Sequence, residues 1–385
     1  MSGVDPALVA RVRSRLAVEV REPSAQAVAA ALGVEAGLHG SATVLGVVDA
    51  LQRERRGAGV LQPLLDDPAT TDVVVNGCRA VHRDRGRGLE PVDVSFADEA
   101  AVRRLAQRLA ALAGRRLDDA SPWVDARLPD GTRLHAVLAP LVRPGTSISL
   151  RVPARRTFGL DELVAAGGVD PAAAALLRAL VAARVAFVVS GGTGSGKTTL
   201  LGALLALVPA AERLVVVEDA AELAPDHPHV VSLEGRPANA EGAGLVTVRD
   251  LVRQALRMRP DRLVVGEVRG GEVVDLLAAL NTGHEGGCGT LHANSASDVP
   301  ARVEALGVAG GLDREAVHSQ LAAGVDVVVH LRRGRDGLRR LEEVGVLQAD
   351  PRGHVRCVRA AGLRGGRWVD DGARPTLDAL LADRS

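Results

Sequence analysis

The stretch Gly191-Gly192-Thr193-Gly194-Ser195-Gly196-Lys197-Thr198 decides the fold of this chain. It follows the apolar run Val185-Ala186-Phe187-Val188-Val189 and precedes a segment rich in Leu and Ala. Glycines at these spacings allow backbone N–H groups to curl around phosphate oxygens, where a Cβ atom would block the approach. A strand, this loop and a helix in that order predict a P-loop that binds ATP.

Each residue type in the loop suits a phosphate site. We expect Lys197 to reach the β- and γ-phosphates and the Thr198 hydroxyl to coordinate Mg²⁺, while the helix N-terminus adds the positive end of its dipole. A Gly-rich turn without a ligand is the alternative, and the flanking strand and helix patterns disfavour it. The predicted cofactor-binding residues are Gly191, Gly192, Thr193, Gly194, Ser195, Gly196, Lys197, Thr198 and Thr199.

Length and charge bound the remaining possibilities. A chain of 385 residues exceeds the usual size of one hydrophobic core, so two domains are expected. The 47 basic and 47 acidic residues balance, so no overall field would attract nucleic acid or an anionic bilayer. Two Trp, three Phe and no Tyr leave few side chains to stack bases. We therefore expect no nucleic-acid partner.

Cysteines and apolar runs predict the compartment. Cys78, Cys288 and Cys357 are far apart and form no CxxC, which disfavours a disulfide framework or a thiolate zinc site. The N-terminus lacks the order of a signal peptide. The apolar stretch from Leu200 to Ala211 is shorter than the roughly 18 residues that span a bilayer. We expect a cytoplasmic protein without a transmembrane segment, and any membrane association to be peripheral.

The pattern along the chain predicts an α/β fold in four parts. Residues 1–59 have apolar positions at helical spacing and form a helical appendage; residues 60–152 form a smaller mixed α+β domain. Residues 153–160 read as a linker. Alternating apolar strands and helices over 161–385 predict a parallel sheet covered on both faces.

Individual segments support this division. Thr71 to Val75 is β-branched and precedes the hairpin signal Asn76-Gly77. Near the C-terminus, the runs Val325 to Leu331 and Leu341 to Leu347 predict added strands. The Arg- and Gly-rich tail is expected to be loosely ordered from Ala360 until Leu377.

Two strand ends could supply the carboxylates of hydrolysis. One must hold Mg²⁺ or its waters and another must orient the attacking water, and both are best placed at strand ends that face the P-loop. The candidates follow Val215-Val216-Val217, as Glu218, Asp219 and Glu222, and Leu263-Val264-Val265, as Glu267. The residues alone do not rank them, and solvated loop charges are the alternative.

Two histidines bracket a Gly-rich segment. His284 and His292 have neither HExxH nor other short zinc spacing, so structural histidines are the main alternative to a metal site. The functional hypothesis is that an imidazole at a strand end contacts the γ-phosphate.

The P-loop and the blocks that follow it resemble those of secretion motor ATPases, most closely the CpaF-like branch that drives Tad/Flp pilus assembly. Besides the P-loop, three blocks match in order: Glu218 to Leu223 is similar to the aspartate box, Leu256 to Arg269 to the atypical Walker B, and Gly283 to Asn294 to the histidine box. Val75-Asn76-Gly77 and 114–133 match in the N-terminal half, so the resemblance covers roughly residues 60 to 345. It departs at Ala220, where a proline is common.

The resemblance implies a RecA-like ATPase domain and a division of roles. Glu222 would be the catalytic carboxylate, and Glu267 would act near Mg²⁺ and the attacking water. Arg133 and Arg151 would be supplied by a neighbouring subunit, and a surface or interdomain ion pair is the alternative for each. Arg269 and His292, in the matching Walker B and histidine blocks, complete the predicted catalytic set.

The resemblance also implies partners and leaves competing functions open. A hexameric ring would act on inner-membrane platform proteins from the cytoplasmic face of the membrane. A type IV secretion or conjugation ATPase shares the same boxes. A RecA-like nucleic-acid motor is disfavoured by zero net charge and scarce aromatics. A scaffold that binds ATP but barely hydrolyses it is disfavoured by Glu222 and Glu267.

Overall fold

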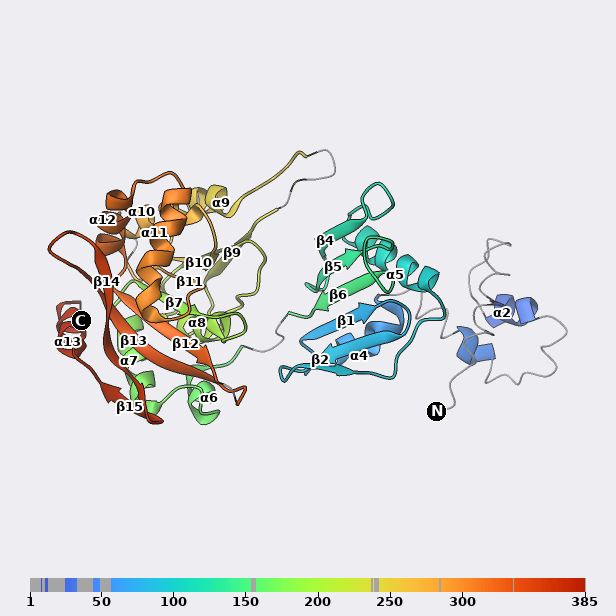
Figure 1. The fold of residues 1–385 in the computed structure, drawn as a ribbon, viewed down its shortest axis with the longest axis horizontal. Helices are drawn as coiled ribbons and strands as arrows, with labels where there is room; N and C mark the ends of the chain where they lie inside the picture. Colours follow the sequence, from blue (N-terminus) through green and yellow to red (C-terminus); the bar gives the residue numbers. More distant parts are fainter. Residues whose placement is uncertain are drawn as a thin grey trace. The chain divides into compact units, whose positions relative to one another are not determined.

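The computed structural model describes residues 8, 11–12, 25–32, 44–48, 57–153, 157–236, 238, 242–283, 285–334 and 336–384. The chain divides into two compact units, Met1–Arg155 and Arg156–Ser385 (Figure 1). Each unit has a sheet and a hydrophobic core of its own.

Short helical segments precede the first sheet. Helix α2 spans Ala25–Leu32, and residues 8, 11–12 and 44–48 are also helical. Leu8, Val28 and Val47 belong to a small buried cluster that these segments share. Residues 1–7, 9–10, 13–24, 33–43 and 49–56 of the predicted appendage lie outside the described part of the chain.

The first unit contains a six-stranded antiparallel sheet in the order β3-β2-β1-β6-β5-β4. Asn76 and Gly77 begin the β1–β2 turn as predicted, and Gly77 has a φ of +67°. The elements are η2 (Gly59–Leu61), α4 (Gln62–Asp66), β1 (Asp72–Asn76), β2 (Ala80–Asp84), β3 (Leu89–Pro91), α5 (Glu99–Leu112), β4 (Trp123–Arg127), β5 (Arg133–Val137) and β6 (Ser147–Arg151).

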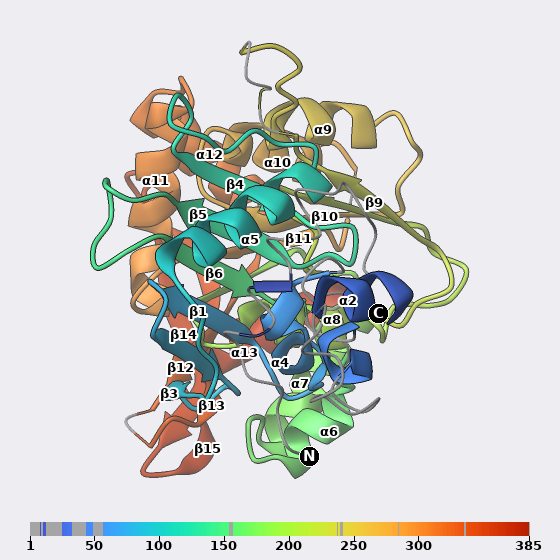
Figure 2. The ribbon, with the colours of Figure 1, turned by 90° about the vertical axis from the view of Figure 1, so that its right-hand side faces the viewer.

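Helix α5 covers one face of this sheet (Figure 2). Its N-terminus is capped by the Asp98 side chain, which accepts a hydrogen bond from the Ala101 N–H at 2.7 Å. Val102 and Leu109 of the helix are fully buried in the same cluster as Leu134 and Ile148 of the sheet. Because side chains alternate along a strand, polar residues such as Arg133, His135 and Ser149 lie on the opposite face.

The second unit contains a nine-stranded mixed sheet in the order β15-β14-β13-β12-β7-β11-β10-β8-β9. The six strands from β12 to β9 are parallel, and β13 to β15 extend the sheet in antiparallel fashion. The strands are β7 (Phe187–Gly191), β8 (Leu214–Glu218), β9 (Val230–Glu234), β10 (Arg262–Val268), β11 (Cys288–Leu291), β12 (Val327–Arg333), β13 (Arg339–Ala349), β14 (Val355–Arg364) and β15 (Arg367–Asp370).

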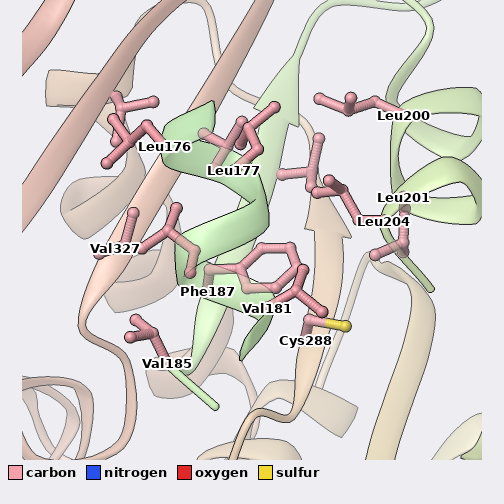
Figure 3. Packing of buried hydrophobic residues seen from close by; sticks show 14 of the residues in the cluster. Leu176, Leu177, Val181, Val185, Phe187, Leu200, Leu201, Leu204, Cys288 and Val327 are labelled. Atoms are coloured by element: carbon pink, nitrogen blue, oxygen red, sulfur yellow. The ribbon is translucent and has the colours of Figure 1, made fainter. Parts of the chain in front are cut away.

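Helices cover both faces of the parallel part, so its strands are continuous apolar runs. Figure 3 shows Leu176, Leu177 and Leu201 around Phe187 on one face, where α7 and α8 pack. The other face packs against α9 to α12. The helices are α6 (Leu160–Ala165), α7 (Pro171–Ala182), α8 (Lys197–Leu205), α9 (Val248–Ala255), α10 (Glu272–Leu280), η3 (Ala296–Asp298), α11 (Val299–Ala309), α12 (Arg314–Gly324) and α13 (Arg374–Asp383).

The C-terminal region is more regular than the sequence suggested. The added strands at 325–331 and 341–347 are confirmed as β12 and β13, but the expectation of a loosely ordered tail from Ala360 is wrong. Strands β14 and β15 and helix α13 occupy the tail, and Leu377 is fully buried in the main core. Ladder hydrogen bonds to β13 order this segment, and ion pairs such as Arg364–Asp371 accommodate its exposed arginines.

Candidate functional site

The P-loop joins the end of β7 to the start of α8 in the geometry that phosphate binding requires. Gly191, Gly194 and Gly196 have φ values of +152°, +69° and +96°, which L-residues with side chains rarely adopt. A Cβ atom at Gly191 would also overlap the carbonyl oxygen of Leu331 on the neighbouring strand β12. The glycines are therefore required by backbone conformation and by close packing.

Lys197, the first residue of α8, is folded back onto the loop. Its Nζ atom donates to the carbonyl oxygens of Gly191 and Gly192 at 3.0 Å each and lies 3.4 Å from His292 Nδ1. Burial lowers the pKa of Lys197, and Glu267 opposes that effect. The ammonium group is thus held at the centre of a polar cluster.

Residues at the ends of β10 and β11 surround this ammonium group. His292 Nε2 lies 2.6 Å from Glu267 Oε1, and the Arg269 guanidinium donates to Glu267 Oε2 at 2.5 Å. Because an ammonium group can only donate, His292 Nδ1 accepts from Lys197 and Nε2 carries the proton toward Glu267. Three of the predicted catalytic residues are therefore in contact.

The environment of Glu267 keeps it ionised. Partial burial acts to raise its pKa, but Arg269, His292 and Lys197 together outweigh this effect and the pKa is lowered. Burial, together with the charge of Lys197, lowers the pKa of His292. The site therefore combines a carboxylate, a neutral imidazole and two cations.

Glu218, at the end of β8, has the opposite environment. It is buried, and its Oε1 atom accepts from the backbone N–H groups of Glu222 and Leu223 at 3.1 Å each. A side chain at Gly266 of β10 would overlap it. Burial raises the pKa of Glu218 to about 7. This carboxyl group supports the loop rather than facing the P-loop lysine.

Glu222 lies in the loop that Glu218 supports. The residue is exposed, and its charge acts on both Lys197 and Arg269. Oδ2 of Asp219, in the same loop, lies 3.6 Å from Nη1 of Arg269. The structure therefore separates the candidates: the charges of Glu267 and Glu222 act on Lys197, whereas Glu218 is buried and accepts backbone N–H groups of the loop.

A pocket of about 360 Å³ opens beside the first residues of the P-loop. The residues that line it come from the P-loop, from the end of β11 and from the start of α11. They are Gly192, Thr193, His292, Ala293, Asn294, Asp298 and Arg302. Asn294, Asp298 and Arg302 were not singled out from the sequence.

A buried histidine, His330, connects the P-loop strand to this pocket. His330 of β12 hydrogen-bonds through Nδ1 to Ser190 Oγ at 2.8 Å, and the main chain of Asn294 hydrogen-bonds to the same ring. Both His330 and Ser190 are buried, and burial lowers the pKa of His330. The sequence carried one signal that was not used, a histidine within the apolar run Val327-Val328-Val329-His330.

The loop residues fit a polyphosphate ligand. Ser195 Oγ is buried and, within the described part of the chain, has no hydrogen-bond partner. The backbone of the three positive-φ glycines and the first turn of α8, with Thr198 and Thr199, surround the same place. An orphaned hydroxyl beside a positively charged loop and a lysine suits phosphate oxygens.

Arg133 and Arg151 lie in the other compact unit. They are directly opposite each other on β5 and β6, and Arg127 of β4 is opposite Arg133. The three side chains therefore share the sheet face that α5 does not cover. Their role at a phosphate site stays a prediction. His284 lies outside the described residues.

Within the described residues, no helix is long and apolar enough to cross a bilayer.

Comparison with known proteins agrees with this architecture. The family model described as "Type II/IV secretion system protein" matches residues 54–367. A putative conjugal transfer protein of Mycobacterium tuberculosis H37Rv is 61% identical over 352 residues, which cover 90% of this chain and 99% of the relative. The conjugal transfer protein TrbB of Rhizobium radiobacter is 34% identical over 285 residues, 73% of this chain and 84% of TrbB.

Solved structures show the same fold. The ATPase DotB of Legionella pneumophila has a TM-score of 0.53 at 17% identity and covers 84% of this chain and 82% of its own. The pilus retraction motor PilT with bound ADP has a TM-score of 0.52 at 18% identity, covering 84% and 85%. The α/β fold, with a mixed N-terminal domain before a RecA-like domain, is confirmed. The chain therefore belongs to the type II/IV secretion system protein family.

Proposed function

We propose that this protein is an ATPase that hydrolyses ATP to ADP and phosphate and couples the reaction to mechanical work in a secretion or pilus machine. The observation that carries the proposal is the cluster around Lys197, in which a P-loop lysine, an ionised Glu267, a neutral His292 and Arg269 are in contact. A binding loop without catalysis has no need for this ionised carboxylate.

Each residue has a distinct task in this proposal. The P-loop amides and Lys197 bind the phosphates, and Thr198 and Glu267 hold Mg²⁺, directly or through water. When bound, Mg²⁺ neutralises charge on the phosphate oxygens. Glu222 polarises the attacking water. His292 lies between Glu267 and Lys197, where loss of the γ-phosphate would change its hydrogen bonds.

The proposal includes an assembly. Arg133 and Arg151 are contributed by a neighbouring copy to the developing phosphoryl charge, in a hexameric ring with one nucleotide per subunit. Domain movement upon nucleotide binding and release would be the working step. We propose domain boundaries at residues 60–152 and 161–385, with 153–160 as the linker.

The biological setting follows from the sequence resemblance. We propose Tad/Flp-type pilus assembly or protein secretion, on inner-membrane platform proteins, by a cytoplasmic protein that associates peripherally with the membrane. A second candidate is a type IV secretion or conjugation ATPase. The names of the M. tuberculosis and R. radiobacter relatives, which refer to conjugal transfer, favour this second candidate.

The test compares ATP turnover across protein concentration with mass from light scattering. Turnover of the wild type is expected to rise as the ring forms. Glu222→Gln should bind ATP but lose about 10²-fold or more in turnover, because the water is no longer polarised. Arg133→Ala should lose a similar factor while it still assembles.

Matched controls make this test specific. Glu315→Gln removes an exposed carboxylate of α12 that has no role in the proposal, so this variant should behave as wild type. Concentration-independent turnover by a monomer would contradict the shared site. Unchanged turnover in Glu222→Gln would contradict its catalytic role.

A further inference from the structure

The hairpin formed by β12 and β13 lies beside the P-loop. Strand β12 pairs with β7 as far as Leu331 opposite Gly191, and the hairpin then continues to Arg333 and back from Arg339. A register irregularity between His330 and Leu331 re-aims the strand just before this point. The end of the hairpin is therefore placed along the loop by backbone pairing.

The four arginines at the end of the hairpin divide between its two faces. Arg332 is opposite Arg340, and Arg333 is opposite Arg339. Because side chains alternate along a strand, the two pairs project to opposite faces. Arg332 pairs with Glu342 at 3.4 Å and Arg340 with Asp336 at 2.7 Å, so the first face is neutralised within the hairpin.

The second face lies against the P-loop glycines. A Cβ atom at Gly196 would lie 3.4 Å from Arg339 Cδ, and one at Gly194 would lie 3.9 Å from Arg333 Nη1. Both glycines are in the loop whose amides bind phosphate in the proposed function. The two arginines thus approach the loop from an element more than a hundred residues further along the sequence.

The second face carries two positive charges beside the P-loop, and Arg333 Nε donates to the Gly337 carbonyl oxygen at 3.3 Å. Within the described residues, Arg339 forms no ion pair, and the residue directly opposite it is another arginine. Like charges directly across a ladder are destabilising unless an anion lies between them. The ligand that would offset this repulsion is therefore negatively charged, and the adjacent loop already selects phosphate.

We propose that Arg333 and Arg339 bind the phosphate chain of the nucleotide that the P-loop holds, as a second, hairpin-borne part of the same site. The inference rests on the proposed function. Guanidinium groups offer several donors in a planar fork that matches phosphate oxygens.

The principal test is ADP binding by calorimetry to the full-length chain. Arg339→Gln is expected to weaken ADP binding by about tenfold, the lower range for a hydrogen bond to a charged group at an exposed position. Arg339→Lys should recover part of that loss because it keeps the charge. Arg332→Gln, on the neutralised face of the same hairpin, is the matched control and should bind as wild type.

A purely structural role for Arg339 is excluded by a further variant. Arg339→Met keeps the apolar stem that lies on Gly196 but removes the charge, so it should behave like Arg339→Gln. ADP binding by Arg339→Met at wild-type strength would overturn the proposal and leave a packing role. An equal loss in Arg332→Gln would also overturn it, because any nearby charge would then have the same effect.

A measurement on the unaltered chain avoids the problem of a variant that does not fold. Modification by an arginine-specific dicarbonyl, mapped by mass spectrometry, should be slowed by ADP at Arg339 and not at Arg332. Equal protection at both would contradict the proposal. Lys197→Ala separates failure of the proposed function from failure of the hairpin proposal. If Lys197→Ala binds ADP as tightly as the wild type, the proposed P-loop function fails. If Lys197→Ala weakens ADP binding but Arg339→Gln does not, only the proposed role of the hairpin fails.

Discussion

Glu218 and Glu267 lie at the ends of two neighbouring strands of the same sheet, yet their pKa values are shifted in opposite directions. Glu218 is buried, accepts two backbone N–H groups and has its pKa raised to about 7. Glu267 is partly exposed, contacts Arg269 and His292, and has its pKa lowered. Position at a strand end therefore does not decide whether a carboxylate stays ionised; burial and the neighbouring cations do.

The division of roles follows from these surroundings. A carboxyl group near neutrality that caps backbone amides stabilises the loop bearing Glu222. A carboxylate that stays ionised among cations can hold a metal ion or its waters without waiting for deprotonation. Variants that replace each carboxyl group with a neutral amide of the same shape test this difference between Glu218 and Glu267.

The largest effect is expected at Glu267. Glu267→Gln removes the charge that His292, Arg269 and Lys197 share, so ATP turnover should fall by about 10²–10³-fold, the range for losing one preorganised electrostatic group. Binding of ADP should change only slightly. Steady-state turnover and calorimetry measure the two quantities. Glu218→Gln is the internal control: an equal loss of turnover there would refute the distinction between the two acids.

The next effect is on stability and its pH dependence, at Glu218. The pKa of about 7 in the folded chain exceeds the ordinary value of 4.5, so the folded state retains a proton that the unfolded state has released. The contribution of Glu218 to stability is therefore greatest below pH 4.5, falls as the pH rises to about 7, and stays lower above it, by about 3 kcal/mol. Glu218→Gln removes this loss while keeping a hydrogen-bond acceptor.

Urea unfolding at pH 5 and pH 8 measures that effect. The variant should gain stability relative to the wild type at pH 8 and gain less at pH 5. Glu272→Gln provides the comparison, because the Glu272 carboxylate also accepts backbone N–H groups but is not buried. A pH-independent difference for Glu218→Gln would show that its carboxyl group titrates normally.

The smallest effect is expected at His330. His330→Leu removes the link between Ser190 and Asn294 without a change in charge at neutral pH, and we expect about a tenfold loss of turnover, since two buried polar groups lose a partner. His330→Gln can still donate and accept, so it should recover most of the loss. Comparison of kcat and KM for the two variants is the measurement; equal loss in both would indicate packing alone.

The local elements of the fold and of this site could be predicted from the sequence because each depends on residues close together in the chain. The glycines of the P-loop, the β-branched strands and the capped helix α5 follow from backbone conformation and local patterning. The ordered tail was missed because its strands carry exposed arginines, and their order comes from pairing with β13 and from ion pairs such as Arg374–Asp370.

The sequence could not rank Glu218 and Glu267 because the difference lies in what surrounds them. Each follows a run of apolar residues, and each is followed by further charges. Only the sheet places Gly266 over Glu218, and only the adjacency of β10 and β11 places His292 against Glu267. The resemblance to a family assigned roles to Glu222 and Glu267, which stay predictions, and the opposite pKa shifts distinguish Glu267 from Glu218.

The sequence by itself determined that a P-loop joins a strand to a helix, because that property depends on eight consecutive residues. The tertiary structure decided what surrounds the loop. His292, His330 and Arg339 lie far from it in the chain, and reach it only because β7 is placed between β11 and β12 in the sheet. Local propensity acts over a few residues, whereas strand order is set by burying both faces of the whole sheet.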